Sequence, residues 1–109
     1  MRLDMKREPI LSEPRDYFLV SAGLIHKKIM LSTKMPTSNP IVLTFKGVHY
    51  IDCGLDLQNA TLFECCVEER NQFLGRICGD RDCPGGSLFA LVTPLRTNFI
   101  LADLLKTTP

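Results

Sequence analysis

The stretch that most constrains the fold is GGSLFALVTPLRTNFILADLL, residues 85–105. It combines a Gly-Gly break, an apolar run of strand length, a Thr-Pro step and further apolar residues at wider spacing. An uninterrupted run such as SLFALV is typical of a strand that is buried on both faces. Since a chain of 109 residues can build only a small core, something must cover this apolar surface.

The Thr-Pro step predicts a change from strand to helix. Thr93 is a favourable N-cap residue, and Pro94 suits the first helical position because its missing N–H would lack an intrahelical acceptor there. The apolar positions that follow have helical spacing. They are Leu95, Phe99, Leu101, Leu104 and Leu105. We therefore predict one helix from about 94 to 106, apolar over much of its circumference.

Upstream of this stretch, strand-length apolar runs alternate with turn-forming residues. The runs DYFLVSAGL, HKKIMLST, PIVLTFKGVHYIDCG and ATLFECC favour extended structure, and Gly47 marks a hairpin or a strong bend. Residues 21–31 could instead form one helical stretch. We interpret the polar EERNQ, residues 68–72, as a turn between two antiparallel strands.

Two regions are therefore predicted. Residues 1–15 are charged, contain Pro9 and Pro14 and show no sustained period, so we expect a flexible arm. Residues 16–109 are expected to form a mainly β domain, a small antiparallel β-barrel with one C-terminal helix. The outer face of such a barrel and an apolar helix exceed what a lone domain of this size readily buries, so we expect a second chain to cover them.

Composition and charge exclude several classes of protein. Hydrophobic residues make up 45% and charged residues 23% of the chain, as in globular proteins. Residues 1–50 hold eight Lys/Arg against four Asp/Glu, and residues 51–109 hold five against eight, so strong direct binding of nucleic acid is not expected. Neither a membrane span nor a secretory signal is indicated. We expect an intracellular protein, nuclear or cytoplasmic, with reduced thiols.

The residues that could carry chemistry do not form a recognisable constellation. Five cysteines and two histidines supply possible nucleophiles and bases, but their spacing does not support catalysis. Cys78 and Cys83 flank a knuckle-like loop, and Cys65 with Cys66 could complete a zinc site, although zinc sites more typically show two close pairs. We therefore predict no enzyme activity and no cofactor. The alternatives are a small zinc-stabilised interaction domain and a free-standing barrel that binds single-stranded nucleic acid.

The run from Gly85 to Leu105 resembles the end of the barrel domain in an accessory subunit of the eukaryotic type 2 ribonuclease H (ribonuclease H2), the one whose barrel is followed by a long helical region. A Gly-rich turn, a strand, a Thr-Pro and a Phe-containing apolar helix follow in this order in that family. YFLVSAGL, residues 17–24, is similar to its opening strand. The resemblance implies a non-catalytic subunit that interleaves its strands with another subunit in a triple barrel, within a complex that handles RNA/DNA hybrids.

The function expected from these observations is an accessory or scaffold role. The chain would form a heterodimer, or alternatively a homodimer, through strand edges and the terminal helix, within a larger nucleic-acid-processing complex. The residues predicted to bind the partner belong to the last strand and the helix. They are Leu88, Phe89, Leu91, Thr93, Pro94, Leu95, Phe99, Leu101, Leu104 and Leu105.

Overall fold

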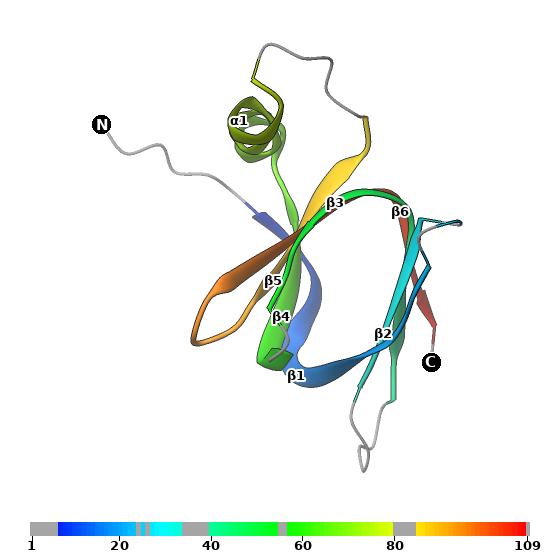
Figure 1. Cartoon of the computed structure of the whole chain (residues 1–109). Helices are drawn as coiled ribbons and strands as arrows, with labels where there is room; N and C mark the ends of the chain where they lie inside the picture. Colours follow the sequence, from blue (N-terminus) through cyan, green and yellow to red (C-terminus); the bar gives the residue numbers. More distant parts are fainter. Residues whose placement is uncertain are drawn as a thin grey trace.

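The computed structural model describes residues 7–23, 25, 27–33, 40–54, 57–79 and 85–108. Within these residues the chain forms six strands and one helix (Figure 1). In chain order they are β1 (Arg7–Gly23), β2 (Lys28–Thr33), β3 (Val42–Asp52), β4 (Leu57–Cys65), α1 (Val67–Cys78), β5 (Ser87–Val92) and β6 (Thr97–Thr108). No helix in the described part of the chain is long and apolar enough to cross a membrane.

The six strands form a closed antiparallel barrel in the order β1-β2-β3-β6-β5-β4. The mainly β fold class predicted from the sequence is therefore confirmed. The barrel closes within one chain, because β1 pairs with β4 as well as with β2. Strand edges that stay open along their whole length, as expected for interleaving, are thus not found among the described residues. Interleaving with a second chain stays a prediction.

The barrel closes because its long strands bend. β3 runs unbroken through Gly47, which has a φ of 63°, and its register with β6 shifts between Val48 and Tyr50. Of the two structures that Gly47 suggested, the bent strand is confirmed and the hairpin is wrong. A Cβ atom at Gly47 would lie 2.3 Å from Oδ2 of Asp103 on β6, so the bend needs glycine for space as well as for its φ.

The interior of the barrel holds the larger of two apolar clusters. Phe45 on β3 and Phe89 on β5 meet edge to face, with ring centroids 5.5 Å apart. Side chains from all six strands surround this pair. They include Tyr17, Leu31, Leu43, Leu62, Leu91 and Ile100. Burial of these side chains away from water is the main contribution to the stability of the barrel.

The second cluster lies outside the barrel wall, beneath α1. Phe73 and Leu74 of the helix are buried against the outward-facing residues of β5 and β6. The strand residues are Leu88, Ala90 and Leu101, with Phe99 at the margin. β5 is therefore buried on both faces, as its uninterrupted apolar run predicted. The turn predicted for residues 68–72 is wrong, because these residues lie within α1.

The helix predicted over residues 94–106 is also wrong. A short turn follows β5, and Thr97–Thr108 forms β6. Thr93 does cap this segment, but it caps a turn: its Oγ1 accepts a hydrogen bond from the backbone N–H of Arg96 (3.1 Å) and donates one to the Arg96 carbonyl (3.0 Å). Thr and Pro favour such turns as well as helix starts, so the local signal was ambiguous.

The predicted N-terminal arm is corrected as well. Residues 7–15 belong to β1, which pairs with β4 from Arg7 opposite Cys65 to Tyr17 opposite Leu57. Residues 1–6 lie outside the described part. The alternative of one helical stretch over residues 21–31 is wrong, because Gly23 pairs with Lys28 at the end of the β1–β2 hairpin.

Candidate functional site

One end of the barrel wall is paired on one side only. β1 pairs with β4 up to Tyr17 opposite Leu57, whereas it pairs with β2 from Tyr17 to Gly23. Within the described residues, the segment 18–23 therefore has a strand neighbour on a single side. Its other edge presents backbone N–H and C=O groups that are not used by the strand ladder.

The last part of β3 has the same property. β3 pairs with β6 as far as Asp52, but with β2 only as far as Lys46. One further hydrogen bond, from the Val48 N–H to the Lys27 carbonyl at 2.8 Å, closes this ladder. Residues 49–52 thus form a second edge without a β2 partner, next to the tip of the β1–β2 hairpin.

An apolar groove lies between these two edges. It consists of an outer part of about 320 Å³ and an inner part of about 130 Å³ that share Ala22, Ile29 and Ile51. Ile29 comes from β2, while the inner part reaches Ile100 on β6. We call this the barrel-end groove and define it by Leu19, Ala22, Ile29, Tyr50, Ile51 and Leu57.

Large apolar side chains stay exposed around this groove. Leu19 is 52% and Ile51 is 45% exposed. Three of the nine large hydrophobic residues that are exposed in the described structure line the groove. These three are Leu19, Tyr50 and Ile51, and Phe18 and Val20 are exposed beside them on β1. Clustered apolar exposure of this kind marks interaction surfaces more often than chance placement does.

The charged groups at the groove are basic. Lys27 and Lys28 line its outer part together with His49. The described lining of both parts holds no Asp or Glu. Nε2 of His49 lies 2.7 Å from Oδ1 of Asp103 on β6, so this ring nitrogen already has a hydrogen-bond partner within the chain. The two lysines form no ion pair with another described residue, which leaves their charge available to a ligand.

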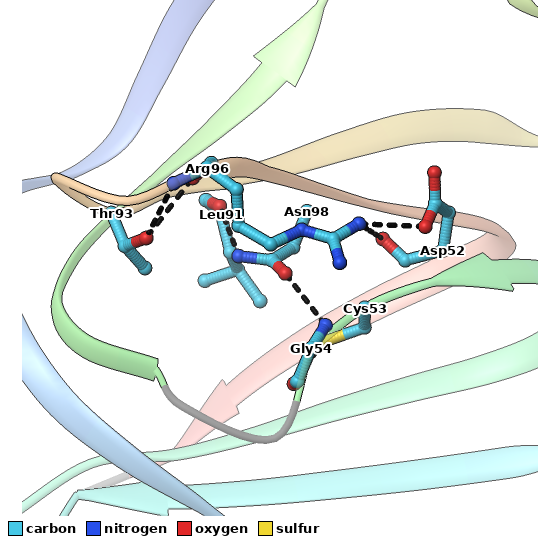
Figure 2. Close-up of polar contacts among 7 residues, drawn as sticks. All are labelled: Asp52, Cys53, Gly54, Leu91, Thr93, Arg96 and Asn98. Atoms are coloured by element: carbon cyan, nitrogen blue, oxygen red, sulfur yellow. Dashed lines mark hydrogen bonds and ion pairs between the residues drawn. The ribbon is translucent and has the colours of Figure 1, made fainter.

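A buried amide holds the far wall of the groove in place. Asn98 on β6 is fully buried, and its Oδ1 accepts a hydrogen bond from the Gly54 N–H (2.7 Å). Its Nδ2 donates to the Leu91 carbonyl (3.0 Å), so one side chain joins β5 to the segment after β3 (Figure 2). Because buried backbone groups require partners, this amide fixes the position of the chain that follows Ile51.

A surface ion pair reinforces the same junction. Arg96, in the turn before β6, places a guanidinium nitrogen 2.7 Å from Oδ1 of Asp52 (Figure 2). Both side chains are about half exposed, so the pair contributes little to stability. The ion pair neutralises the charge of Asp52, which directly follows the groove residue Ile51 in the sequence.

The thiol at this junction is a poor nucleophile. Cys53 lines the inner part of the groove, and its Sγ donates to the Gly54 carbonyl at 3.3 Å. Burial raises the pKa of the Cys53 thiol, although nearby Arg96 opposes this effect. The reactive form of cysteine is the thiolate, so the geometry favours a packing role for Cys53.

A second polar cluster ties β1 to α1, away from the groove. Nε of Arg7 donates to Oε1 of Glu69 at 2.8 Å, and a second nitrogen bonds the other carboxylate oxygen. The hydrogen bond from Arg7 lowers the pKa of Glu69. Burial, with further effects of Glu69, raises the pKa of Cys65 to about 12. Arg7 also lies 6.0 Å from the ring centroid of Phe99, so the cluster helps to dock the helix.

The predicted partner-binding residues do not form one surface. Five are buried in the two apolar clusters or in the turn: Leu88, Phe89, Leu91, Thr93 and Leu101. Phe99 and Leu105 are half-buried, whereas Pro94, Leu95 and Leu104 are exposed. Leu95 is 80% exposed at the tip of the β5–β6 turn. The structure thus separates these ten residues between the core and isolated surface positions.

Of the cysteines considered for zinc, the described ones lie at opposite ends of α1. Among the described residues, no group of three His, Cys, Asp or Glu side chains could hold a metal ion. Cys65 ends β4, Cys66 precedes α1, and Cys78 is its last residue. Cys83 lies outside the described residues.

Sequence reasoning missed the groove residues, although a signal was present. Phe18, Leu19 and Val20 form a consecutive apolar run, yet β1 is not buried on both faces there as β5 is. The run is followed at the hairpin tip by Lys27 and Lys28, where β-rich proteins usually place small turn formers. An apolar run followed by a basic hairpin tip was therefore the sequence pattern that could have indicated an exposed binding surface.

Comparison with known proteins gives no relative from which a role can be transferred. No family model, no curated protein and no solved structure matches this chain.

Proposed function

We propose that this chain is a non-catalytic protein-interaction module that docks another protein at the barrel-end groove. The observation that carries the proposal is the coincidence of two strand edges, each paired on one side only in the described residues, with the exposed apolar side chains of Leu19, Tyr50 and Ile51. Apolar side chains give affinity through burial, and free backbone groups give direction through hydrogen bonds.

The chemistry of the remaining groups supports a binding role. The thiols of Cys53 and Cys65 both have raised pKa values, which opposes thiolate chemistry at neutral pH. Glu69 is held in a two-point hydrogen bond by Arg7, and Asp52 is paired with Arg96. These acids serve structural contacts in the described residues.

The wider setting of such a module is part of the proposal. Resemblance to the barrel domain of a ribonuclease H2 accessory subunit suggests a heterodimeric member of a nucleic-acid-processing complex, in the nucleus or the cytoplasm. The docking mode carried over from that family is not retained, because residues 94–106 form a turn and β6 instead of a helix. The groove replaces that segment as the proposed docking element.

A pull-down with two matched variants tests the proposal. Ile51→Asp places a charge in the groove, whereas Leu95→Asp places the same charge on the exposed β5–β6 turn. Both residues are exposed enough that the thermal unfolding midpoint should change little. The expected result is that proteins retained by the wild-type chain and by Leu95→Asp, identified by mass spectrometry, are lost with Ile51→Asp.

Two results would contradict the proposal. Equal retention of the same proteins by both variants would place the docking surface elsewhere. Turnover of a substrate by the purified wild-type chain would exclude a purely non-catalytic role. The ribonuclease H2-like setting has its own test, because co-expression with the catalytic subunit and the other accessory subunit of that enzyme should then give a complex that copurifies in fixed proportion.

A further inference from the structure

We propose that the groove receives an extended peptide strand with alternating apolar residues and acidic residues at its end, inserted between β1 and β3. This inference rests on the proposed function and names the kind of partner that the groove fits. It follows from three independent properties of the groove: its backbone edges, its apolar floor and its charge.

The backbone edges favour a strand over a helix. Among the residues that the structure describes, 18–23 of β1 and 49–52 of β3 each have a ladder partner on one side only. Both segments are already extended and held on that side, by β2 and β6 respectively. An extended peptide can hydrogen-bond to such an edge along its length, whereas a helix has no free backbone groups to offer.

The floor of the groove favours apolar side chains at alternate positions. Leu19 pairs with Leu31 and Ala22 pairs with Ile29, so these two β1 residues are on the side of the strand that faces the interior. The floor reaches Ile100, which is buried in the barrel core. Successive side chains of a bound strand point in opposite directions, so every second one would enter this floor.

The charge at the outer part favours an acidic terminus. Lys27 and Lys28 lie at the hairpin tip and line the outer part, whose described lining contains no acidic residue. Asp103 lies behind this lining, where it contacts His49. A peptide strand that passes the hairpin tip would place its end next to these two ammonium groups. Opposite charges raise the affinity of the correct partner and disfavour basic ones.

A single-stranded nucleic acid is the competing occupant, and the lining argues against it. Lysines and the exposed ring of Tyr50 would suit phosphates and a base. However, the greater part of the groove is aliphatic, and its two backbone edges would find no regular partner in a sugar-phosphate chain. The aliphatic floor and the edges together favour a peptide.

The test uses two synthetic peptides, each with about six alternating Val and Thr residues, the usual length of a strand. One peptide carries Asp-Asp at both ends and the other carries Lys-Lys. Titration of the whole chain, followed by fluorescence anisotropy, should show about three- to tenfold tighter binding of the acidic peptide. Amide NMR shifts should be largest in residues 18–23 and 49–52.

Variants separate charge recognition from the groove itself. The double change Lys27→Glu with Lys28→Glu should reverse the preference, while Lys106→Glu, on the exposed outer side of β6, should leave it unchanged. Ile51→Asp should abolish binding of both peptides. The unfolding midpoint of each variant shows whether its fold is kept.

Several outcomes would overturn the inference. Equal affinity for the two peptides, a preference that survives the double lysine change, or shifts confined to another surface would each do so. Binding of a labelled single-stranded oligonucleotide at residues 18–23 and 49–52, with no peptide binding, would favour the competing occupant. If Ile51→Asp removes the captured proteins in the pull-down but neither peptide binds the wild-type chain, the proposed protein docking is supported and the proposed acidic peptide strand is rejected.

Discussion

The surface under α1 and the barrel-end groove are both apolar, but only the first is covered by the chain itself. Leu101 of β6 is fully buried beneath Phe73 and its helical neighbours. In the groove, Ile51 of β3 remains 45% exposed, and Leu19 across from it is more exposed still. The same kind of side chain therefore stabilises the fold in one place and stays available in the other.

This difference shows where a partner would be needed. The apolar segment 85–105 is predicted from the sequence to require a second chain, but α1 and the barrel core cover most of it and leave Leu95 and Leu104 exposed. Exposed apolar surface is found instead at the barrel-end groove, where β1 and β3 each have a strand partner on one side only in the described residues. An apolar sequence alone thus does not identify an interface. The position of the covering element decides which apolar surface remains open.

Matched truncations of two phenylalanines give the largest expected contrast. Phe73→Ala removes a ring that is 4% exposed and that meets Tyr50 and Phe99, so we expect a loss of about 3–5 kcal/mol in the free energy of unfolding. Phe18→Ala, at a residue next to the groove, should cost less than about 1 kcal/mol. Chemical denaturation measures both, and equal losses would remove the distinction between the two surfaces.

The amide that fixes the groove wall gives the next effect. Asn98→Ala leaves the Gly54 N–H and the Leu91 carbonyl without their buried partner, which should cost about 1–3 kcal/mol. It should also weaken binding at the groove, because the chain after Ile51 loses its anchor. Urea denaturation and the peptide titration measure the two consequences. Full stability with full binding would show that the wall does not depend on this residue.

Two glycines with similar φ sharpen the role of the bend. Gly47→Ala combines a φ of 63° with a Cβ atom 2.3 Å from Asp103, whereas Gly79→Ala has a φ of 59° and open space around it. Both changes carry the strain of a positive φ, but Gly79 lies at the exposed end of α1, where the backbone can adjust, whereas Gly47 lies within the paired strand β3. Gly47→Ala should therefore lower the thermal midpoint further than Gly79→Ala. Equal midpoints would mean that the Asp103 side chain simply moves aside.

Acid should loosen the helix-covered surface slightly, which is the smallest effect. Because Arg7 lowers the pKa of Glu69 below its usual value of about 4.5, the unfolded chain takes up this proton first as the pH falls. The stabilising contribution is present above that pH and is lost as the pH falls through the lower, folded-state value. Glu69→Gln should remove about 1 kcal/mol at neutral pH and flatten the acid dependence of unfolding. An unchanged pH profile in this variant would assign the acid sensitivity to other groups.

Much of the fold could be predicted from local pattern, but β6 could not. SLFALV and KIMLST are strands because their length and β-favouring residues leave little alternative. In β6, however, Phe99 and Leu101 face α1 while Ile100 and Ala102 face the barrel core. When both faces of a strand are apolar, alternation disappears from the sequence, and the remaining spacing resembles a helix.

The sequence of α1 contains helix signals, although its polar segment EERNQ was interpreted as a turn. Glu68 and Glu69 lie in its first turn, Arg76 lies in its last turn, and Gly79 follows its end, all typical helix features. The groove could not be predicted in this way. The groove exists because the pairing of β1 with β4 stops at Tyr17. The register between two strands that are distant in the sequence cannot be predicted from the residues of either strand alone.

The seam between β1 and β4 is the least regular ladder of the barrel, with register shifts after Pro9, Leu11 and Arg15. Two prolines in this stretch, Pro9 and Pro14, cannot donate backbone hydrogen bonds to β4. Native-state opening fluctuations should therefore begin along this seam and spread toward Tyr17. The barrel can therefore open locally by separation of β1 from β4, without first unfolding the part that α1 covers.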